Sequence, residues 1–265
     1  MNKYKTNTRI FLRNLTLDFL GLNVKPSSGI HLLNSHLISM NKDIDSNFFD
    51  DQLKKLSKKS TIIPFAEGVE IIKKKKILHH SLIAFSYDDG LAECFTHIAP
   101  VIEKYNGYAC FFINPNFIYG DTAYVNNFLR DKVHLPAYKE PMSWNQISDL
   151  YKRGHIIGAH TMDHIRVSEI YDIDTLHLQI GNCKKELKSA INVDCDFFAF
   201  PYGHPDRDFN ISSVLVAKSY YNNVFSASNW RKYFSYNEKV LNRRHCEPYW
   251  KANHINYFLS KQISY

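Results

Sequence analysis

Two pairs of residues in this chain have the types and spacing that metal-assisted hydrolysis uses. Asp88 and Asp89 come at the end of the apolar run SLIAFS and precede a glycine. Adjacent carboxylates at such a place are costly to bury unless they are paired or bind a metal ion. His160 and His164 follow another apolar run. Placed at i and i+4 in one helical turn, they would face the same way and bind one divalent ion.

Each pair also has a simpler explanation. An Asp-Asp-Gly turn that caps a helix accounts for the carboxylates, and a chain with 13 histidines produces a His-x3-His spacing by chance. The position of both pairs at strand ends favours the metal interpretation. One carboxylate and two histidines leave coordination sites open for water and substrate, as a catalytic metal requires.

A third polar segment is the tetrapeptide Phe-Pro-Tyr-Gly at residues 200–203, again at the end of an apolar run. Such a turn can direct a backbone N–H into a site and the Tyr202 side chain across it. A plain turn explains the same residues equally well.

The composition is that of a folded protein and excludes several other classes. The 265 residues are 45% hydrophobic and carry a net charge of +7. This charge permits a phosphate-bearing or membrane-surface partner, but a lysine-rich solvated surface also explains it. Basic residues are dispersed and no nucleic-acid-binding motif is present, so we expect no nucleic acid partner. The five cysteines have no C-x-x-C spacing, which argues against a disulfide framework or a cysteine-based zinc site.

The first 24 residues are basic, but Arg13, Asn14 and Asp18 interrupt their apolar positions. We therefore expect no signal peptide, and no run reaches the ~18 apolar residues of a membrane span. A cytoplasmic protein is the expectation. Apolar residues between positions 10 and 20 would form one face of a short amphipathic segment. Packing on the body of the protein explains that face better than peripheral membrane contact does, although such contact stays open.

The elements that must position these residues alternate between strands and helices. Strands are expected to begin near Gly29, Thr61, Ser81, Tyr108, His155, Phe197, Asn222 and Lys239, with helices between them. Such repeated units build a parallel sheet, and about seven of them favour a barrel. Active groups of barrels lie on loops after the strand ends. The stretch from Pro115 to Pro141 reads as irregular and is a candidate substrate loop.

The three polar segments, in this order and at strand ends, resemble the polysaccharide deacetylases of carbohydrate esterase family 4, the NodB-homology family. The resemblance covers about residues 81–247. It extends towards the N-terminus through Ser35-His36 and the segment 49–53, which are similar to one branch of that family. The fold that the resemblance implies is α/β, a distorted (β/α) barrel of about seven units with an N-terminal extension. Residues 81–265 would form the barrel, and residues 1–80 would pack a strand and helices on it within one structural domain.

The resemblance also implies roles for individual residues. Asp88 matches the general base. Asp89, His160 and His164 match the metal ligands, and Tyr202 matches the residue whose backbone N–H stabilises the oxyanion.

Departures from the family pattern shape the remaining assignments. An arginine that commonly orients the base is replaced by Ala199. No late Leu-x-His motif is visible, so His36 is the candidate acid by resemblance, with His204 and His245 as alternatives. Arg243, with its neighbour Arg244, would bind a phosphate or carboxylate of the substrate or orient the base. A solvated strand end explains the two arginines equally well.

Two further residues are expected to contact the substrate. They are Pro201, in the Phe-Pro-Tyr-Gly turn, and Trp230, as an aromatic wall for a sugar ring. A core position explains Trp230 equally well.

Together these expectations describe a hydrolase of carbon–nitrogen bonds other than peptide bonds, which removes an N-acetyl group from an amino sugar. The cofactor would be one divalent metal ion. Zinc is the expected metal, and nickel, cobalt and iron would accept the same ligands. A cytoplasmic member would act on a nucleotide-, lipid- or glycan-linked intermediate of glycan biosynthesis. Two alternatives remain: a deformylase or non-sugar amidase that uses the same metal site, and an inactive carbohydrate-binding homologue.

Overall fold

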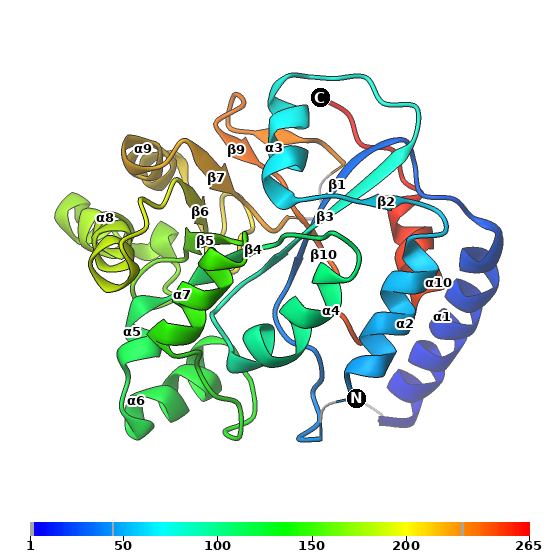
Figure 1. Cartoon of the computed structure of the whole chain (residues 1–265), viewed down its shortest axis with the longest axis horizontal. Coiled ribbons are helices and arrows are strands. Elements are labelled where there is room, and N and C mark those ends of the chain that lie inside the picture. The colour runs from blue at the N-terminus through cyan, green and yellow to red at the C-terminus, as the bar shows by residue number, and fades with distance from the viewer. Residues whose placement is uncertain (1–2, 44, 229–230) are drawn as a thin grey trace.

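The computed structural model describes residues 3–43, 45–228 and 231–265. Its strands form one sheet (Figure 1). They are β1 (Gly29–Ser35), β2 (Thr61–Ile62), β3 (Ser81–Tyr87), β4 (Cys110–Ile113), β5 (Ile156–Ala159), β6 (Phe197–Ala199), β7 (Asn223–Phe225), β8 (Phe234–Ser235), β9 (Val240–Leu241) and β10 (Arg244–His245).

Helices connect most of these strands. The α-helices are α1 (Lys3–Asn23), α2 (Ser46–Leu56), α3 (Phe65–Lys73), α4 (Ala99–Glu103), α5 (Pro115–Tyr119), α6 (Thr122–Asn127), α7 (Trp144–Lys152), α8 (Ile173–Ile191), α9 (Ile211–Tyr220) and α10 (Ala252–Leu259). Short π-helical turns at Cys94–Ile98 and Phe128–Lys132 and a 3-10 turn at Val167–Glu169 complete them. None of the described helices is long and apolar enough to cross a membrane.

The sheet confirms the expected distorted barrel. The strand order is β10-β1-β3-β4-β5-β6-β7-β9-β8, with β2 beside β3, and all described pairs are parallel except β8 with β9. β9 and β10 stand near opposite ends of this order, yet only Asn242 and Arg243 separate them. Two linking residues span about 10 Å at most, so the chain itself closes the barrel there. The single last strand expected from Lys239 is therefore wrong, because the chain leaves one edge of the sheet and joins the other.

Alternate strand residues face opposite sides of the sheet. The residues on one side of the sheet pack with α3 in a core cluster that includes Leu32, Ala84, Phe112 and Phe225. Figure 1 shows α3 across the sheet near the beginning of β1 and β3. The residues on the opposite side of the sheet pack against the remaining helices. Gly158 has no side chain because a Cβ there would lie 2.4 Å from the Phe112 ring.

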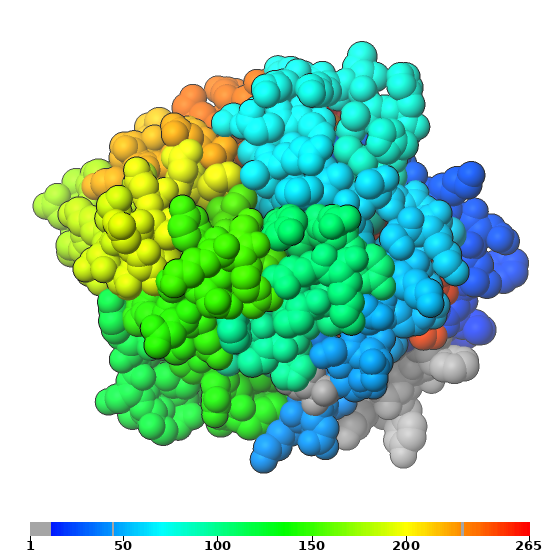
Figure 2. Space-filling model, in the orientation of Figure 1, coloured from blue at the N-terminus to red at the C-terminus, as the bar shows by residue number. Residues whose placement is uncertain are grey.

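The N-terminal segment contributes to the sheet as well as to the helices around it. β1 lies between β10 and β3, with seven residues in register with β3. α1 and α2 lie beside α10 at one side of the barrel (Figure 1), and Figure 2 shows the N-terminal part of the chain, in blue to cyan, covering that flank. The division of the chain at residue 80 stays a prediction.

The stretch 115–141 is not irregular, contrary to expectation. It contains α5, α6 and the turn Phe128–Lys132. Short helices of five or six residues give weak periodic signals, which explains the error.

Candidate metal and catalytic site

Asp88 is buried at the end of β3, and Arg243 holds it. The guanidinium donates from Nη1 to Oδ1 at 2.7 Å and from Nη2 to Oδ2 at 2.9 Å. Burial alone would raise the pKa of Asp88, but the charge of Arg243 lowers that pKa to about 2. The carboxylate is therefore ionised and fixed in orientation at neutral pH.

Arg243 reaches Asp88 because it lies on the two-residue link that closes the barrel. Its side chain is fully buried. The Nε donates to the Ser226 carbonyl at 2.9 Å and Nη1 to the Ser86 hydroxyl at 2.9 Å, while the guanidinium lies 4.7 Å from the centre of the Phe112 ring. Of the two roles expected for Arg243, this geometry agrees with orientation of the base. It leaves no exposed surface with which Arg243 could bind substrate.

Asp89, His160 and His164 converge beside Asp88. Asp89 Oδ1 lies 3.6 Å from His160 Nε2 and 3.3 Å from His164 Nε2. All three side chains are buried. Asp89 Oδ1 has no hydrogen-bond partner among the described residues. Burial is the main cause that raises the pKa of this carboxyl, to about 7, against the opposing charges of His36 and Arg243.

A divalent cation fits this arrangement. Bonds of about 2.1 Å at tetrahedral or octahedral angles put neighbouring ligand atoms roughly 3.0–3.4 Å apart, close to the spacings here. His160 Nδ1 lies 2.7 Å from the Ala199 carbonyl, which fixes the tautomer and leaves Nε2 as an acceptor. Burial lowers the pKa of His160 to about 4 and that of His164 well below its ordinary range. Both imidazoles are therefore neutral, the form that binds metal.

The two histidines are not on a helical turn as the spacing predicted. Residues 161–163 form a tight turn, and Thr161 and His164 have φ of 62° and 50°. Asn114 holds this turn by donating to the carbonyls of His160 and Thr161. Asp89 also has a positive φ, 74°. Such conformations are unfavourable for residues other than glycine and concentrate at functional sites.

Tyr202 closes one side of the site. Its φ is 59°, its ring lies 4.7 Å from the His164 ring, and the Arg166 guanidinium lies over the phenol ring, 4.6 Å from its centre. Asp208 in turn accepts from Arg166 Nε at 2.8 Å. No hydrogen bond within the described chain uses the Tyr202 backbone N–H, which leaves it available to a ligand.

His36 lies across the site from Tyr202 and is bound to Glu247. His36 Nδ1 lies 2.7 Å from Glu247 Oε1, and the two side chains are 30% and 2% exposed. Burial would lower the pKa of His36, but the Glu247 charge raises it to about 10. His36 is thus a cation at neutral pH. His245 Nε2 lies 3.5 Å from the same carboxylate oxygen, so His36, His245 and Glu247 form a second group of possible metal ligands. The 2.7 Å between His36 Nδ1 and Glu247 Oε1 is, however, a hydrogen-bond distance.

Two cavities meet at His36 and Tyr202, which line both. One, of about 270 Å³, also reaches Asp89, His164 and the segment 132–135. The other, of about 210 Å³, reaches Asp88, His160 and His245. The segment 132–135 belongs to the stretch expected as a substrate loop, and it does line the site.

Pro201 and His204 are not among the residues that line these two cavities. Pro201 is buried, and its carbonyl accepts from the Gly203 N–H at 2.6 Å, so it shapes the turn. His204 is exposed, and its Nδ1 lies 2.8 Å from the Pro205 carbonyl. Trp230 lies outside the described residues. Sequence reasoning missed Glu247 altogether, because no motif marks it.

Comparisons with known proteins indicate a family for the chain. The family model described as polysaccharide deacetylase matches residues 75–220. No curated protein matches the chain.

Several solved structures share this fold. IcaB from Ammonifex degensii is 17% identical with a TM-score of 0.69, covering 90% of this chain and 100% of its own. The Streptococcus pyogenes deacetylase PplD in complex with acetate is 15% identical with a TM-score of 0.65, covering 89% and 100%. A de-N-acetylase from Aggregatibacter actinomycetemcomitans is 16% identical with a TM-score of 0.63, covering 87% and 98%. At these identities the likeness concerns the fold.

Proposed function

The chain belongs to the polysaccharide deacetylase family, and from this premise we propose that it is a metal-dependent N-deacetylase of an amino-sugar substrate. One observation carries the proposal. Asp89, His160 and His164 place three ligand atoms around a space for one cation, directly beside a carboxylate that Arg243 keeps ionised.

The three ligands would hold the cation, for which we propose zinc, although nickel, cobalt and iron accept the same donors. When bound, such an ion polarises an acyl carbonyl and lowers the pKa of water. Asp88 accepts the proton from the attacking water at its carboxylate. Because the pKa of Asp88 is low, its carboxylate is a weak base. Its role as base would therefore depend on a cation, held by the three adjacent ligands, that lowers the pKa of the water.

The Tyr202 N–H is the proposed donor to the oxyanion that forms on the acyl oxygen. The left-handed conformation of Tyr202 and the contacts of its ring with His164 and Arg166 fix the direction of this N–H.

His36 is the proposed acid. Glu247 keeps it protonated, and it lines the same cavity as Asp88. As the carbon–nitrogen bond breaks, His36 donates its proton to the leaving amine, and the acyl group departs as acetate. The base and the acid are then two different groups, each held in its protonation state by a buried partner.

The test is an assay of acetate and formate release from N-acetylated nucleotide sugars, lipid-linked sugars and chitin-type oligomers. We expect acetate from at least one amino sugar, and no acetate from Asp88→Asn protein that retains its metal. Formate release instead would identify a deformylase. Carbohydrate binding without turnover would identify an inactive homologue. The cytoplasmic location stays a prediction, which fractionation of the source cells tests.

A further inference from the structure

Helix α1 leaves a stripe of large apolar side chains exposed. Leu12, Leu15, Phe19 and Leu22 are 56%, 57%, 76% and 62% exposed. Spacings of three and four residues put them on one face of the helix. Isolated exposed apolar residues are ordinary, whereas a contiguous stripe marks an interaction surface.

Contacts with α10 fix the orientation of α1. Asp18 accepts from Lys251 Nζ at 2.7 Å and from Asn253 Nδ2 at 3.1 Å, and it lies 2.8 Å from His254 Nε2. Gly21 packs so closely that a Cβ there would lie 2.0 Å from the Asn253 carbonyl oxygen. The stripe cannot rotate inwards without breaking these contacts, so it is a fixed feature of the surface.

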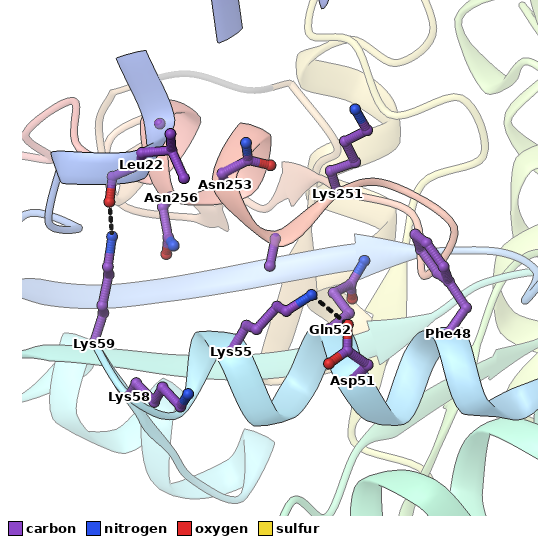
Figure 3. Close-up of a pocket in the computed structure, with 12 residues that line it drawn as sticks. Leu22, Phe48, Asp51, Gln52, Lys55, Lys58, Lys59, Lys251, Asn253 and Asn256 are labelled. Atoms are coloured by element: carbon purple, nitrogen blue, oxygen red, sulfur yellow. Dashed lines mark hydrogen bonds and ion pairs between the residues drawn. The ribbon is translucent and has the colours of Figure 1, made fainter. Parts of the chain in front are cut away.

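The stripe ends at a cavity of about 480 Å³ between α1, α2 and α10, larger than either cavity at the catalytic site (Figure 3). Leu22 and Phe48, which is 47% exposed, line this cavity from α1 and α2. Its charged lining residues are Lys55, Lys58, Lys59, Lys251 and Asp51.

Four lysines line this cavity. Asp51 pairs with Lys55 at 2.5 Å, and Asp18 from α1 pairs with Lys251, so an excess of positive charge remains. Lys59 donates to two carbonyls at the C-terminal end of α1, at 2.8 and 3.0 Å. Lys58 has no hydrogen-bond or ion-pair partner among the described residues, so its ammonium is available to an external anion.

The floor of the cavity is polar and incompletely satisfied. Gln52 and Asn256 are 2% and 4% exposed, and the side-chain oxygen of each has no hydrogen-bond partner among the described residues. Figure 3 shows Asn256 extending from α10 towards α2. A group with hydroxyl donors next to an anionic phosphate would satisfy both the oxygens and the lysines.

We propose that the stripe and the cavity together form a docking surface for an anionic phospholipid bilayer. Apolar side chains of an interfacial helix enter the boundary between head groups and acyl chains, and nearby lysines bind the phosphates. A second copy of the chain is a poorer occupant, because it would bring two positively charged cavities together. This inference goes beyond the proposed function and does not depend on it.

Vesicle flotation with the full chain tests the proposal. We expect binding to vesicles of phosphatidylglycerol and phosphatidylcholine in equal parts to be at least about tenfold stronger than binding to phosphatidylcholine alone. Phe19→Ser and Lys58→Glu should each weaken that binding about tenfold. Ile77→Ser, at a residue 84% exposed after α3, and Lys185→Glu are matched controls outside the surface and should bind as wild type.

Three results would overturn the proposal. The first is equal binding to the two kinds of vesicle. The second is a dimer in sedimentation that Phe19→Ser abolishes, with no binding to vesicles. The third is release of the protein from vesicles by inorganic phosphate, with no effect of Phe19→Ser on vesicle binding. All variants change exposed side chains, and equal thermal unfolding midpoints show that they fold. Acetate release from a soluble substrate should be unchanged in each, which separates this result from the proposed function.

Discussion

Replacing Glu247 by glutamine should convert His36 from a cation to a neutral imidazole across the neutral pH range. In the wild type the Glu247 charge, 2.7 Å away, raises the pKa of His36 from 6.5 to about 10 against the opposing effect of burial. Glutamine keeps an oxygen that can accept from the His36 and Leu37 amides, as Glu247 does at 3.2 and 3.5 Å. The change therefore removes a charge while preserving shape.

The size of the effect follows from the titration. Without the Glu247 charge, burial opposes protonation of His36, and only the charges of Asp89 and Asp88 still raise its pKa. A histidine with the ordinary pKa of about 6.5 sets the scale of the effect. At about pH 8 only about 3% of such a histidine is protonated, so kcat/KM should fall roughly thirtyfold or more. At about pH 6 most of the acid survives and the loss should be several-fold at most. The assay is the pH profile of kcat/KM from acetate release, with metal content measured at each pH.

The sign of the stability effect follows from the same raised pKa. The ion pair of His36 with Glu247 contributes stability that is fully present below about pH 6.5 and is lost as the pH rises through about 10.

Glu238→Gln, on an exposed side chain that pairs with Lys75, is the matched control and should leave the pH profile of kcat/KM unchanged. An equal loss of kcat/KM at both pH values in Glu247→Gln, or no loss, would refute the role of Glu247 in keeping His36 protonated.

Substitutions at three other positions, Arg243, Gly158 and Gln52, test the packing around the site. Arg243→Met should cost about 3–5 kcal/mol in the free energy of unfolding by urea and at least about a hundredfold in kcat, because it leaves Asp88 charged and buried; Arg243→Lys should restore part of both. Gly158→Ala should cost about 1–3 kcal/mol, since its Cβ would overlap the Phe112 ring, and a wild-type urea midpoint would disprove that packing. Gln52→Leu should cost about 1–3 kcal/mol because its amide donates to three carbonyls between residues 247 and 250, with Gln146→Leu on the exposed start of α7 as a milder comparison.

The strand pattern was predictable because buried parallel strands are continuous apolar runs. The run before Asp88 and the run before His160 could each be recognised without structural information. The sequence does not show where the sheet closes. The segment from Lys239 to Glu247 has the composition of one strand, and only the pairing of its two halves with opposite edges of the sheet separates them.

The partners of the catalytic residues were less predictable than the residues themselves. Arg243 and Arg244 are adjacent and must face opposite sides, but the register decides which of them faces Asp88. Glu247 and His36 are 211 residues apart, and Glu247 is one of 26 acidic residues without a motif. Such contacts depend on tertiary packing, so the sequence alone does not specify them.

The most direct test of the central claim measures metal content and acetate release on the same preparations of three proteins. The wild type should bind about one divalent ion per chain and release acetate from an N-acetylated amino sugar. Asp88→Asn should keep the ion and lose turnover, whereas Asp89→Ala should lose both. An Asp89→Ala protein that binds as much metal as the wild type and still releases acetate would contradict the claim.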